Sequence, residues 1–122
     1  MPTVLIVDDD NVFRSDLRTI FNQGSGFDSC VEAGDGADAI VKTKHLSPNL
    51  AVLNFSLPDM TGLQLTRELK AIAPDLPIFM LMADNDPGFE KVALLYGITA
   101  VFSKLDDLTA LVTNARAVCG IQ

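Results

Sequence analysis

The sequence has no apolar run long enough to cross a membrane and no visible targeting segment. Its longest apolar runs, residues 4–7 and 77–83, fall far short of the ~18–20 residues that a membrane span requires. The N-terminus carries neither a basic flank nor a small-residue cleavage site, so no secretory signal is visible. We therefore expect a cytoplasmic protein with no membrane partner.

Basic residues are few. The 122 residues include nine Lys and Arg against 16 Asp and Glu, and the formal net charge is −7. Affinity for the phosphate backbone of nucleic acids comes from clustered Lys and Arg, whereas the nine in this sequence are scattered. We therefore expect no direct binding of nucleic acid by this chain.

Cysteine and histidine are scarce, and neither suggests catalysis. Cys30 and Cys119 lack the spacing of metal ligands, and we interpret them as reduced, buried thiols. His45, the only histidine, lies near the end of a predicted helix, where a solvated side chain is expected. Ser103 has no His and Asp partners in the sequence, so nucleophilic catalysis has no support and we do not expect an enzyme.

What the sequence does contain is a regular alternation of strand-like and helix-like segments. Helical spacing is clear after the first strand, where Phe13, Leu17 and Phe21 repeat at four-residue intervals before Gly24. Buried strands are predicted at residues 3–7, 29–33, 50–55, 77–83 and 100–103. The other helices are predicted from residue 37 to about 46, along 65–73, after a turn at 84–88, and along 108–119.

This pattern predicts one domain over residues 1–122. Hydrophobic residues make up 48% of the chain, enough to fill a core. Five βα units in this length fit an α/β, flavodoxin-like (βα)5 fold, a doubly wound parallel five-stranded sheet with strand order 2-1-3-4-5. In such sheets functional residues lie beyond the carboxyl ends of the strands, which shows where a site is expected.

Polar and unusual residues follow those strand ends. An acidic run begins directly after the first strand, and the third, fourth and fifth strands end in or next to an amide, a thioether and a lysine. Because the carboxyl ends of parallel strands meet at one edge of the sheet, the topology predicts that five residues converge on one pocket. They are Asp8, Asp9, Asn54, Met82 and Lys104.

Two adjacent carboxylates need a compensating cation. The oxygen ligands of Asp8 and Asp9 suit Mg²⁺, which accepts one or two carboxylates and keeps several waters. Lys104, across the predicted pocket, either pairs with those carboxylates or holds a phosphoryl oxygen as a point charge, and the sequence leaves both open. Capping of the first helix by Asp10 or Asn11 accounts for only one acid of the run.

Four segments together resemble the receiver domain of two-component response regulators. They are VLIVDDD at 4–10, AGDGADA at 33–39, LPDMTG at 57–62 and GITAVFSK at 97–104. Each is weak alone, but they occur in order and at the right spacing, and the resemblance covers residues 4–117.

The resemblance implies a mechanism and assigns residues to it. In that family a histidine kinase transfers a phosphoryl group to an aspartate at the end of the third strand. By position, Asp8 and Asp9 would bind Mg²⁺ together with the backbone carbonyl of Ser56, and Lys104 would clasp the phosphoryl group. The fourth helix, fifth strand and fifth helix would then rearrange.

This sequence departs from the family pattern at the residues that carry the chemistry. The phosphoacceptor position holds Asn54, and a carboxamide is a weak nucleophile that offers a metal less charge than a carboxylate. The Thr/Ser position holds Met82, which has no hydroxyl, and the aromatic switch position holds Val101, with Phe102 beside it. Leu105 replaces the usual proline. We therefore predict an atypical receiver that is not phosphorylated at Asn54, binds Mg²⁺ weakly if at all, and acts through protein contacts.

Two other interpretations stay open. One is a conventional phospho-accepting receiver that carries an engineered Asp-to-Asn change at position 54. The other, from a different class, is a small flavodoxin-like ligand-binding domain. A Gly-x-Gly-x-x-Ala pattern at 34–39 is set aside as a dinucleotide fingerprint, because it follows the second strand rather than the first.

The short fourth helix provides the candidate interaction surface. Residues 92–96 are apolar in a row, and Leu94 and Leu95 lie off the predicted buried stripe, which consists of Phe89, Val92, Ala93 and Tyr96. In the family this helix belongs to the signalling and dimerisation face. We therefore expect Leu95, with Leu94, to contact a histidine kinase or other signalling protein, or a second copy through the fourth helix, fifth strand and fifth helix. Single exposed leucines are also common, which is the alternative.

Overall fold

Five strands alternate with five helices along the chain. The computed structural model describes residues 2–84 and 86–121. The strands are β1 (Thr3–Val7), β2 (Ser29–Ala33), β3 (Leu50–Asn54), β4 (Ile78–Met82) and β5 (Ala100–Ser103). The helices are α1 (Asn11–Phe21), α2 (Gly36–Leu46), α3 (Gly62–Ile72), α4 (Pro87–Leu95) and α5 (Leu108–Val118).

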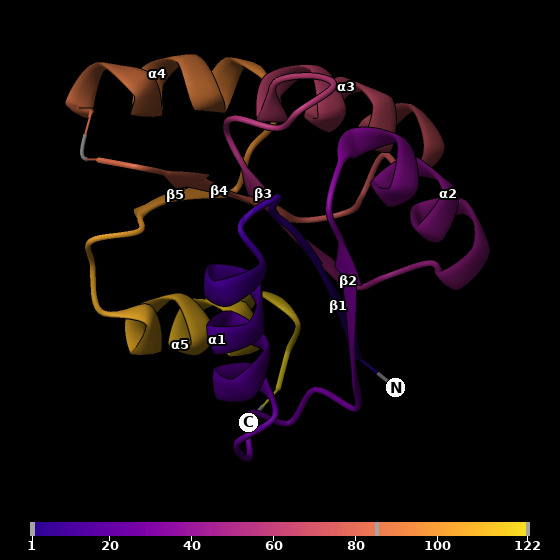
Figure 1. Ribbon diagram of the computed structural model, residues 1–122, viewed down its shortest axis with the longest axis vertical. Coiled ribbons are helices and arrows are strands. Elements are labelled where there is room, and N and C mark those ends of the chain that lie inside the picture. The colour runs from indigo at the N-terminus through magenta and orange to yellow at the C-terminus, as the bar shows by residue number, and fades with distance from the viewer. Residues whose placement is uncertain (1, 85, 122) are drawn as a thin grey trace.

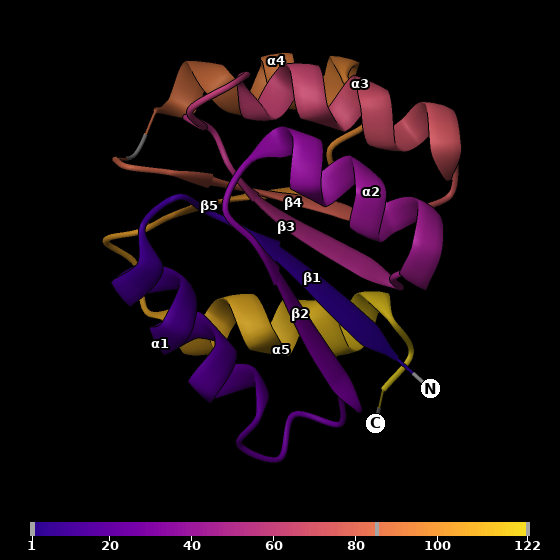
Figure 2. The same cartoon turned by 45° about the vertical axis from the view of Figure 1, so that its right-hand side comes forward.

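The strands form one parallel sheet in the order β2-β1-β3-β4-β5, which confirms the predicted flavodoxin-like topology. Helices α1 and α5 cover one face of the sheet, and α2, α3 and α4 cover the other (Figures 1 and 2). The chain moves from β1 outward to β2, then returns past β1 and continues through β3, β4 and β5. Because each crossover is right-handed, this reversal places helices on both faces of the sheet.

Two apolar cores lie on the two faces of the sheet. Along β1, Leu5 and Val7 pack under the α2, α3 and α4 side, whereas Val4 and Ile6 pack under α1 and α5. Successive side chains of a strand point to opposite faces, so a strand buried on both sides reads as a continuous apolar run. The edge strand β2 has only one fully buried residue, Ala33, which explains its weaker pattern in the sequence.

The predicted element boundaries were wrong at several ends. Strand β3 ends at Asn54, one residue earlier than expected, and β4 is shorter than residues 77–83 at both ends. The turn expected at 84–88 is partly helix: Asp86 caps α4, and its side chain accepts a hydrogen bond from Gly88 N. Pro87 begins the helix because its missing N–H has no helical partner to lose there. Asn85, within that turn, lies outside the described residues.

The cap expected at the start of the first helix is present. The side chain of Asp10 caps α1 and accepts hydrogen bonds from the N–H groups of Val12 and Phe13 at 3.0 and 3.1 Å. No helix in the described ranges has the length and apolar character that crossing a membrane requires.

Candidate functional site

A pocket of about 440 Å³ lies at the carboxyl edge of the sheet. It is formed by residues at the ends of strands β3 and β4 and by the loop that follows β5. Asn54, Ser56, Met82 and Lys104 all line it. Asp8 lies beside it, at the end of β1, and contacts Lys104. Of the five residues expected to converge, Asp9 is the exception, since its side chain is exposed and does not line the pocket.

Asp8 is a fully buried carboxylate whose charge is matched by one cation. Its Oδ1 accepts a hydrogen bond from Asp10 N at 3.0 Å. Its Oδ2 accepts no hydrogen bond from the described residues, but lies 2.6 Å from Nζ of Lys104. A buried charge is stable only when it is paired, so Lys104 compensates this carboxylate. Between the two roles that the sequence left open for Lys104, the geometry shows the ion pair.

The position of Lys104 is fixed by three contacts. Its backbone N–H donates to the carbonyl of Met82 at 2.8 Å, which extends the pairing of β4 and β5 by one residue. Its Nζ lies 4.4 Å from the ring centroid of Phe13 in α1, a cation–π contact, and 2.6 Å from Asp8. The lysine therefore joins the loop after β5 to β1 and α1.

Asn54 is nearly buried, and its amide is used within the loop that follows β3. Nδ2 of Asn54 donates a hydrogen bond to the backbone carbonyl of Ser56 at 2.7 Å. A carboxylate has no hydrogen to give to that oxygen. The amide therefore occupies the same carbonyl that the family resemblance assigns to the metal.

Arg14 reinforces the acidic turn, and the sequence reading missed it. One guanidinium nitrogen, Nη1, donates to the backbone carbonyl of Asp8 at 2.5 Å, and Nε pairs with Glu32 of β2 at 2.9 Å. Nη2 donates to Asn11 Oδ1 at 2.7 Å. The sequence signal for this role was an arginine one helical turn after an acidic run. Its partner Glu32 could not be predicted, because it comes close to Arg14 only when β1 and β2 pair in the sheet.

The loop that carries Ser56 is tied to the start of α2. Asp59 accepts hydrogen bonds from the backbone N–H groups of Gly36 and Ala37, each at 2.9 Å. These two hydrogen bonds lower the pKa of Asp59 below its ordinary 3.8, and the bond from Gly36 has the larger effect. At the end of the loop, Thr61 and Gln64 form a reciprocal capping box that starts α3.

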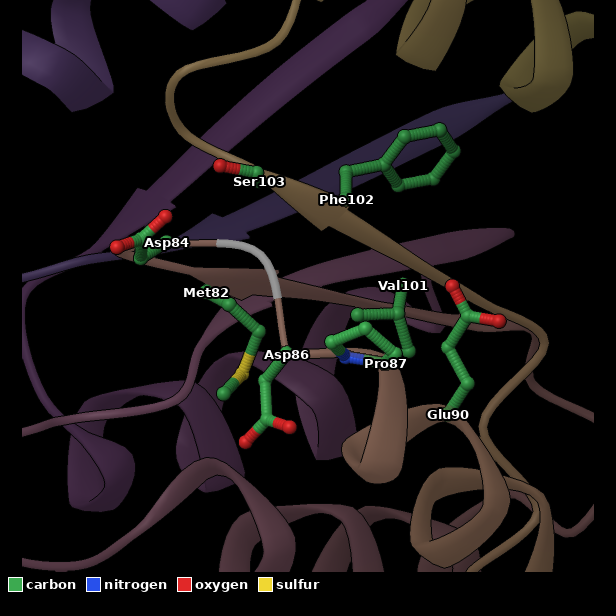
Figure 3. Close-up of a pocket in the computed structure, with 8 residues that line it drawn as sticks. All are labelled: Met82, Asp84, Asp86, Pro87, Glu90, Val101, Phe102 and Ser103. Atoms are coloured by element: carbon green, nitrogen blue, oxygen red, sulfur yellow. The ribbon is translucent and has the colours of Figure 1, made fainter.

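Met82 faces a second, smaller pocket of about 170 Å³ between β4, β5 and the start of α4. Figure 3 shows its side chain pointing to the same side of the sheet as Val101 and Asp86, while the ring of Phe102 points the other way. Phe102 packs against Phe79 in the core under α5, with ring centroids 5.1 Å apart. Asp84 and Glu90 also line this pocket.

Helix α4 exposes leucine side chains next to the charged residues Glu90 and Lys91. Leu94 and Leu95 are 71% and 86% exposed, as expected for residues off the buried stripe. The stripe itself was predicted wrongly in part: Phe89 and Ala93 are buried, but Val92 is 39% exposed. Phe89 and Ala93 lie four residues apart and face the sheet, so Val92, one position before Ala93, is turned toward solvent.

Both cysteines are free and partly buried. Burial raises the pKa of the Cys30 thiol from 9.0 to about 11, because the thiolate would lose its solvation. The positive charge of Arg18 lowers this pKa by a smaller amount, and the negative charge of Glu32 raises it further. Burial also raises the pKa of Cys119. Both thiols are therefore largely protonated near neutral pH.

The residues at the strand ends do not fit a divalent metal in this arrangement. Oδ2 of Asp8 is matched by an ammonium, the carbonyl of Ser56 accepts from the Asn54 amide, and position 54 has no negative charge. Within the described residues no group of three His, Cys, Asp or Glu side chains is placed to hold a metal ion. Hard divalent cations require several oxygen ligands, and of the three that the resemblance assigns, Asp8 and the Ser56 carbonyl already have partners, which leaves the exposed Asp9.

Comparison with known proteins identifies the family. The family model described as the response regulator receiver domain matches residues 4–116. The DNA-binding response regulator MtrA of Mycobacterium tuberculosis strain H37Rv is 40% identical over 114 residues, which cover 93% of this chain and 49% of that protein. A protein-glutamate methylesterase/protein-glutamine glutaminase of Paramagnetospirillum magneticum is 34% identical over 116 residues, 95% of this chain and 31% of that protein.

The solved structures agree on the fold. The chemotaxis protein CheY4 of Vibrio cholerae matches with a TM-score of 0.86 at 23% identity, over 97% of this chain and 98% of that one. A putative transcriptional regulator of Pseudomonas aeruginosa is 34% identical over 118 residues, 97% of this chain and 56% of that protein. The chain therefore spans between 31% and 56% of the length of these three curated relatives. The fold places the chain in the α/β class, with a flavodoxin-like parallel sheet. The chain belongs to the response regulator receiver domain family of two-component signalling.

Proposed function

We propose that this chain is an atypical receiver, which relays a signal through protein contacts and is not phosphorylated at position 54. The observation that carries the proposal is the hydrogen bond from Asn54 Nδ2 to the carbonyl of Ser56 at 2.7 Å. It commits the amide to a structural role within the loop. The amide oxygen is neutral and a weak nucleophile, so an acyl phosphate does not form there.

Two neighbouring positions support the same conclusion. Met82 lines the pocket where the family uses a hydroxyl, and its thioether is only a weak acceptor with no hydrogen to donate to a phosphoryl oxygen. Lys104, the residue that would clasp that oxygen, is already paired with Asp8. These features disfavour the alternative of a conventional receiver changed only at position 54. The match of the receiver family model over residues 4–116 disfavours the other alternative, a small flavodoxin-like ligand-binding domain.

The proposed contact surface is the outer side of α4 with β5 and α5. Leu94 and Leu95 are exposed, and Ala93, Leu94, Ile98 and Val101 line an adjacent pocket of about 280 Å³. Exposed apolar groups in one patch are typical of protein interfaces. The partner is a histidine kinase or another signalling protein, or a second copy of the chain.

We propose neither DNA binding nor catalysis for the residues of this chain. MtrA is named a DNA-binding regulator and another relative a methylesterase, and the chain spans only part of each. A net charge of −7 disfavours direct contact with nucleic acid by these residues, so we propose a cytoplasmic protein-binding role without catalysis.

The test is intact-mass spectrometry after incubation with a small acyl-phosphate donor and Mg²⁺. The chain, an Asn54→Asp variant and an Asn54→Ala variant are compared. We expect the parent chain and Asn54→Ala to keep their masses. A phosphoryl adduct on the parent that maps to position 54 would contradict the proposal.

The Asn54→Asp variant separates natural loss from a laboratory change. If it takes up phosphate stably, only the nucleophile is missing, which favours an engineered or recently lost site. If it stays unmodified, the pocket itself has lost the chemistry, as Met82 and the Asp8–Lys104 pair lead us to expect.

A further inference from the structure

The two exposed leucines of α4 lie on different sides of that helix. Leu94 lines the pocket of about 280 Å³ that borders β5, together with Glu90. Leu95 instead lines a separate pocket of about 470 Å³ between α3 and the end of α4. Residues four apart in a helix are neighbours on its surface, so Glu90 accompanies Leu94 and Lys91 accompanies Leu95. The two sides of α4 therefore differ in charge as well as in position.

Basic residues surround Leu95. Arg67 and Lys70 of α3 line the same pocket, and Lys91 occupies an exposed position one helical turn before Leu95. Arg67 is exposed and pairs with no carboxylate among residues 2–84 and 86–121. Its neighbour Glu68 does not face it, because consecutive residues of a helix point in different directions. Three of the nine Lys and Arg of a chain with a net charge of −7 thus gather around one exposed leucine.

Contacts within the chain orient these cations without neutralising them. Cζ of Arg67 lies 6.0 Å from the ring centroid of Tyr96, a cation–π distance. Nζ of Lys70 donates to the backbone carbonyl of Leu76 at 2.7 Å. A ring and a carbonyl carry no net charge, so both side chains stay cationic. Among the described residues nothing accepts a hydrogen bond from the Arg67 guanidinium, and its donors are available to a carboxylate from outside.

We propose that the pocket between α3 and α4 binds a segment of another protein in which carboxylate side chains flank an apolar one. A carboxylate of that segment pairs with Arg67, whose planar fork of donors suits bidentate binding, and the apolar side chain covers Leu95.

Charge determines the kind of partner that fits this pocket. A symmetric dimer would place the basic surface against its own copy, where like charges repel, so the occupant is a different, acidic protein. Only the need for a protein partner rests on the proposed function, because this pocket lies on the α3 side of α4 rather than on the side of β5 and α5.

The experiment selects short peptides of randomised sequence, displayed on phage, against the intact chain. We expect the selected peptides to combine Asp or Glu with Leu, Ile or Phe, and to bind less tightly as the salt concentration rises. Arg67→Met should weaken their binding by roughly 10-fold or more, because a charge-assisted pair is lost. Arg67→Lys keeps the charge without the planar fork and should retain part of the affinity. The matched control is Lys44→Met, which removes a positive charge from an exposed position of α2 and should leave binding unchanged.

Each of four results would overturn the inference. The selection could yield no enrichment of acidic and apolar residues, or peptides that bind Arg67→Met as tightly as the parent. Peptides that keep their affinity for Arg67→Met but lose it with Leu94→Glu would place the contact on the β5 side, which contradicts this inference and leaves the proposed function standing. Self-association of the parent chain that Arg67→Met abolishes in sedimentation analysis would make a second copy the occupant.

Discussion

The backbone N–H of Gly36 donates a hydrogen bond to Oδ1 of Asp59 at 2.9 Å, across 23 positions of sequence. Asp59 lies in the loop after β3, and Gly36 begins α2, so this bond joins the loop beside Asn54 to a helix on the face of the sheet. The second oxygen of Asp59 accepts from Ala37. One exposed carboxylate thus caps a helix that it does not precede in the chain.

The stability provided by Asp59 should depend on pH. Its pKa is lower in the folded protein than the ordinary 3.8, so the carboxylate stabilises the fold above 3.8 and the effect is lost as pH falls through the lowered value. Asp59→Asn should therefore melt at a lower temperature than the parent near neutral pH, and the difference should narrow below pH 3.8.

Thermal unfolding at several pH values checks this. Asp16→Asn, on the exposed side of α1, removes the same charge without touching a helix N-terminus and serves as the control. A difference between Asp59→Asn and the parent that stays constant across the acid range would show that the carboxylate does not act through its charge.

Arg14 should contribute more to stability than Arg18, although both contact Glu32. Arg14 is 17% exposed and also donates to the Asp8 carbonyl, whereas Arg18 is 51% exposed. We expect Arg14→Met to lower the free energy of unfolding by about 1–3 kcal/mol, because a partly buried carbonyl loses its donor. Arg18→Met should cost less than about 1 kcal/mol. Urea unfolding of both variants tests the order, and equal losses would contradict it.

Gly62 is predicted to tolerate no side chain. A Cβ added there would lie 2.8 Å from the backbone oxygen of Asn54 and 2.6 Å from Sδ of Met80. Since the backbone oxygen cannot move without distorting β3, Gly62→Ala should destabilise the protein by about 1–3 kcal/mol. Gly88→Ala is the control, because the nearest atom to its added Cβ is 3.5 Å away. Similar stabilities of the two variants in urea would show that the chain accommodates the methyl group.

Cys30 should react slowly with alkylating reagents. A pKa raised from 9.0 to about 11 leaves about 100-fold less thiolate near neutral pH, and the thiolate is the reactive form. In a Cys119→Ser background, alkylation by iodoacetamide followed by mass should be slow at neutral pH in the folded protein and fast after unfolding in urea. Rapid modification of the folded chain would contradict the burial of this thiol.

Leu95 should matter for association and little for folding. It is 86% exposed, so Leu95→Glu should change the free energy of unfolding by no more than about 0.5 kcal/mol. If α4 forms a homodimer contact, the same change should shift the parent dimer to monomer in sedimentation analysis. Leu46→Glu, at an exposed leucine of α2, should leave the dimer intact. A parent chain that is monomeric at high concentration would exclude the homodimer and leave a contact with another protein.

The order of the five strands follows from features that are visible along the chain. Strand and helix periodicity and the absence of long connections were enough to predict the sheet order, because a strand buried on both faces and a right-handed crossover leave few alternatives. The same topology brought Asn54, Met82 and Lys104 to one pocket. The caps were readable only where donor and acceptor are close in the chain, as with Asp10.

The sequence by itself thus determined the fold and the convergence of Asn54, Met82 and Lys104 at one edge of the sheet. Only the tertiary structure decided that Lys104 pairs with Asp8 rather than with the exposed Asp9, and that the Asn54 amide takes the Ser56 carbonyl. The reason is physical. Periodicity along the chain fixes which face of an element is buried, whereas the choice among competing partners depends on distances between side chains that come from different strands and helices.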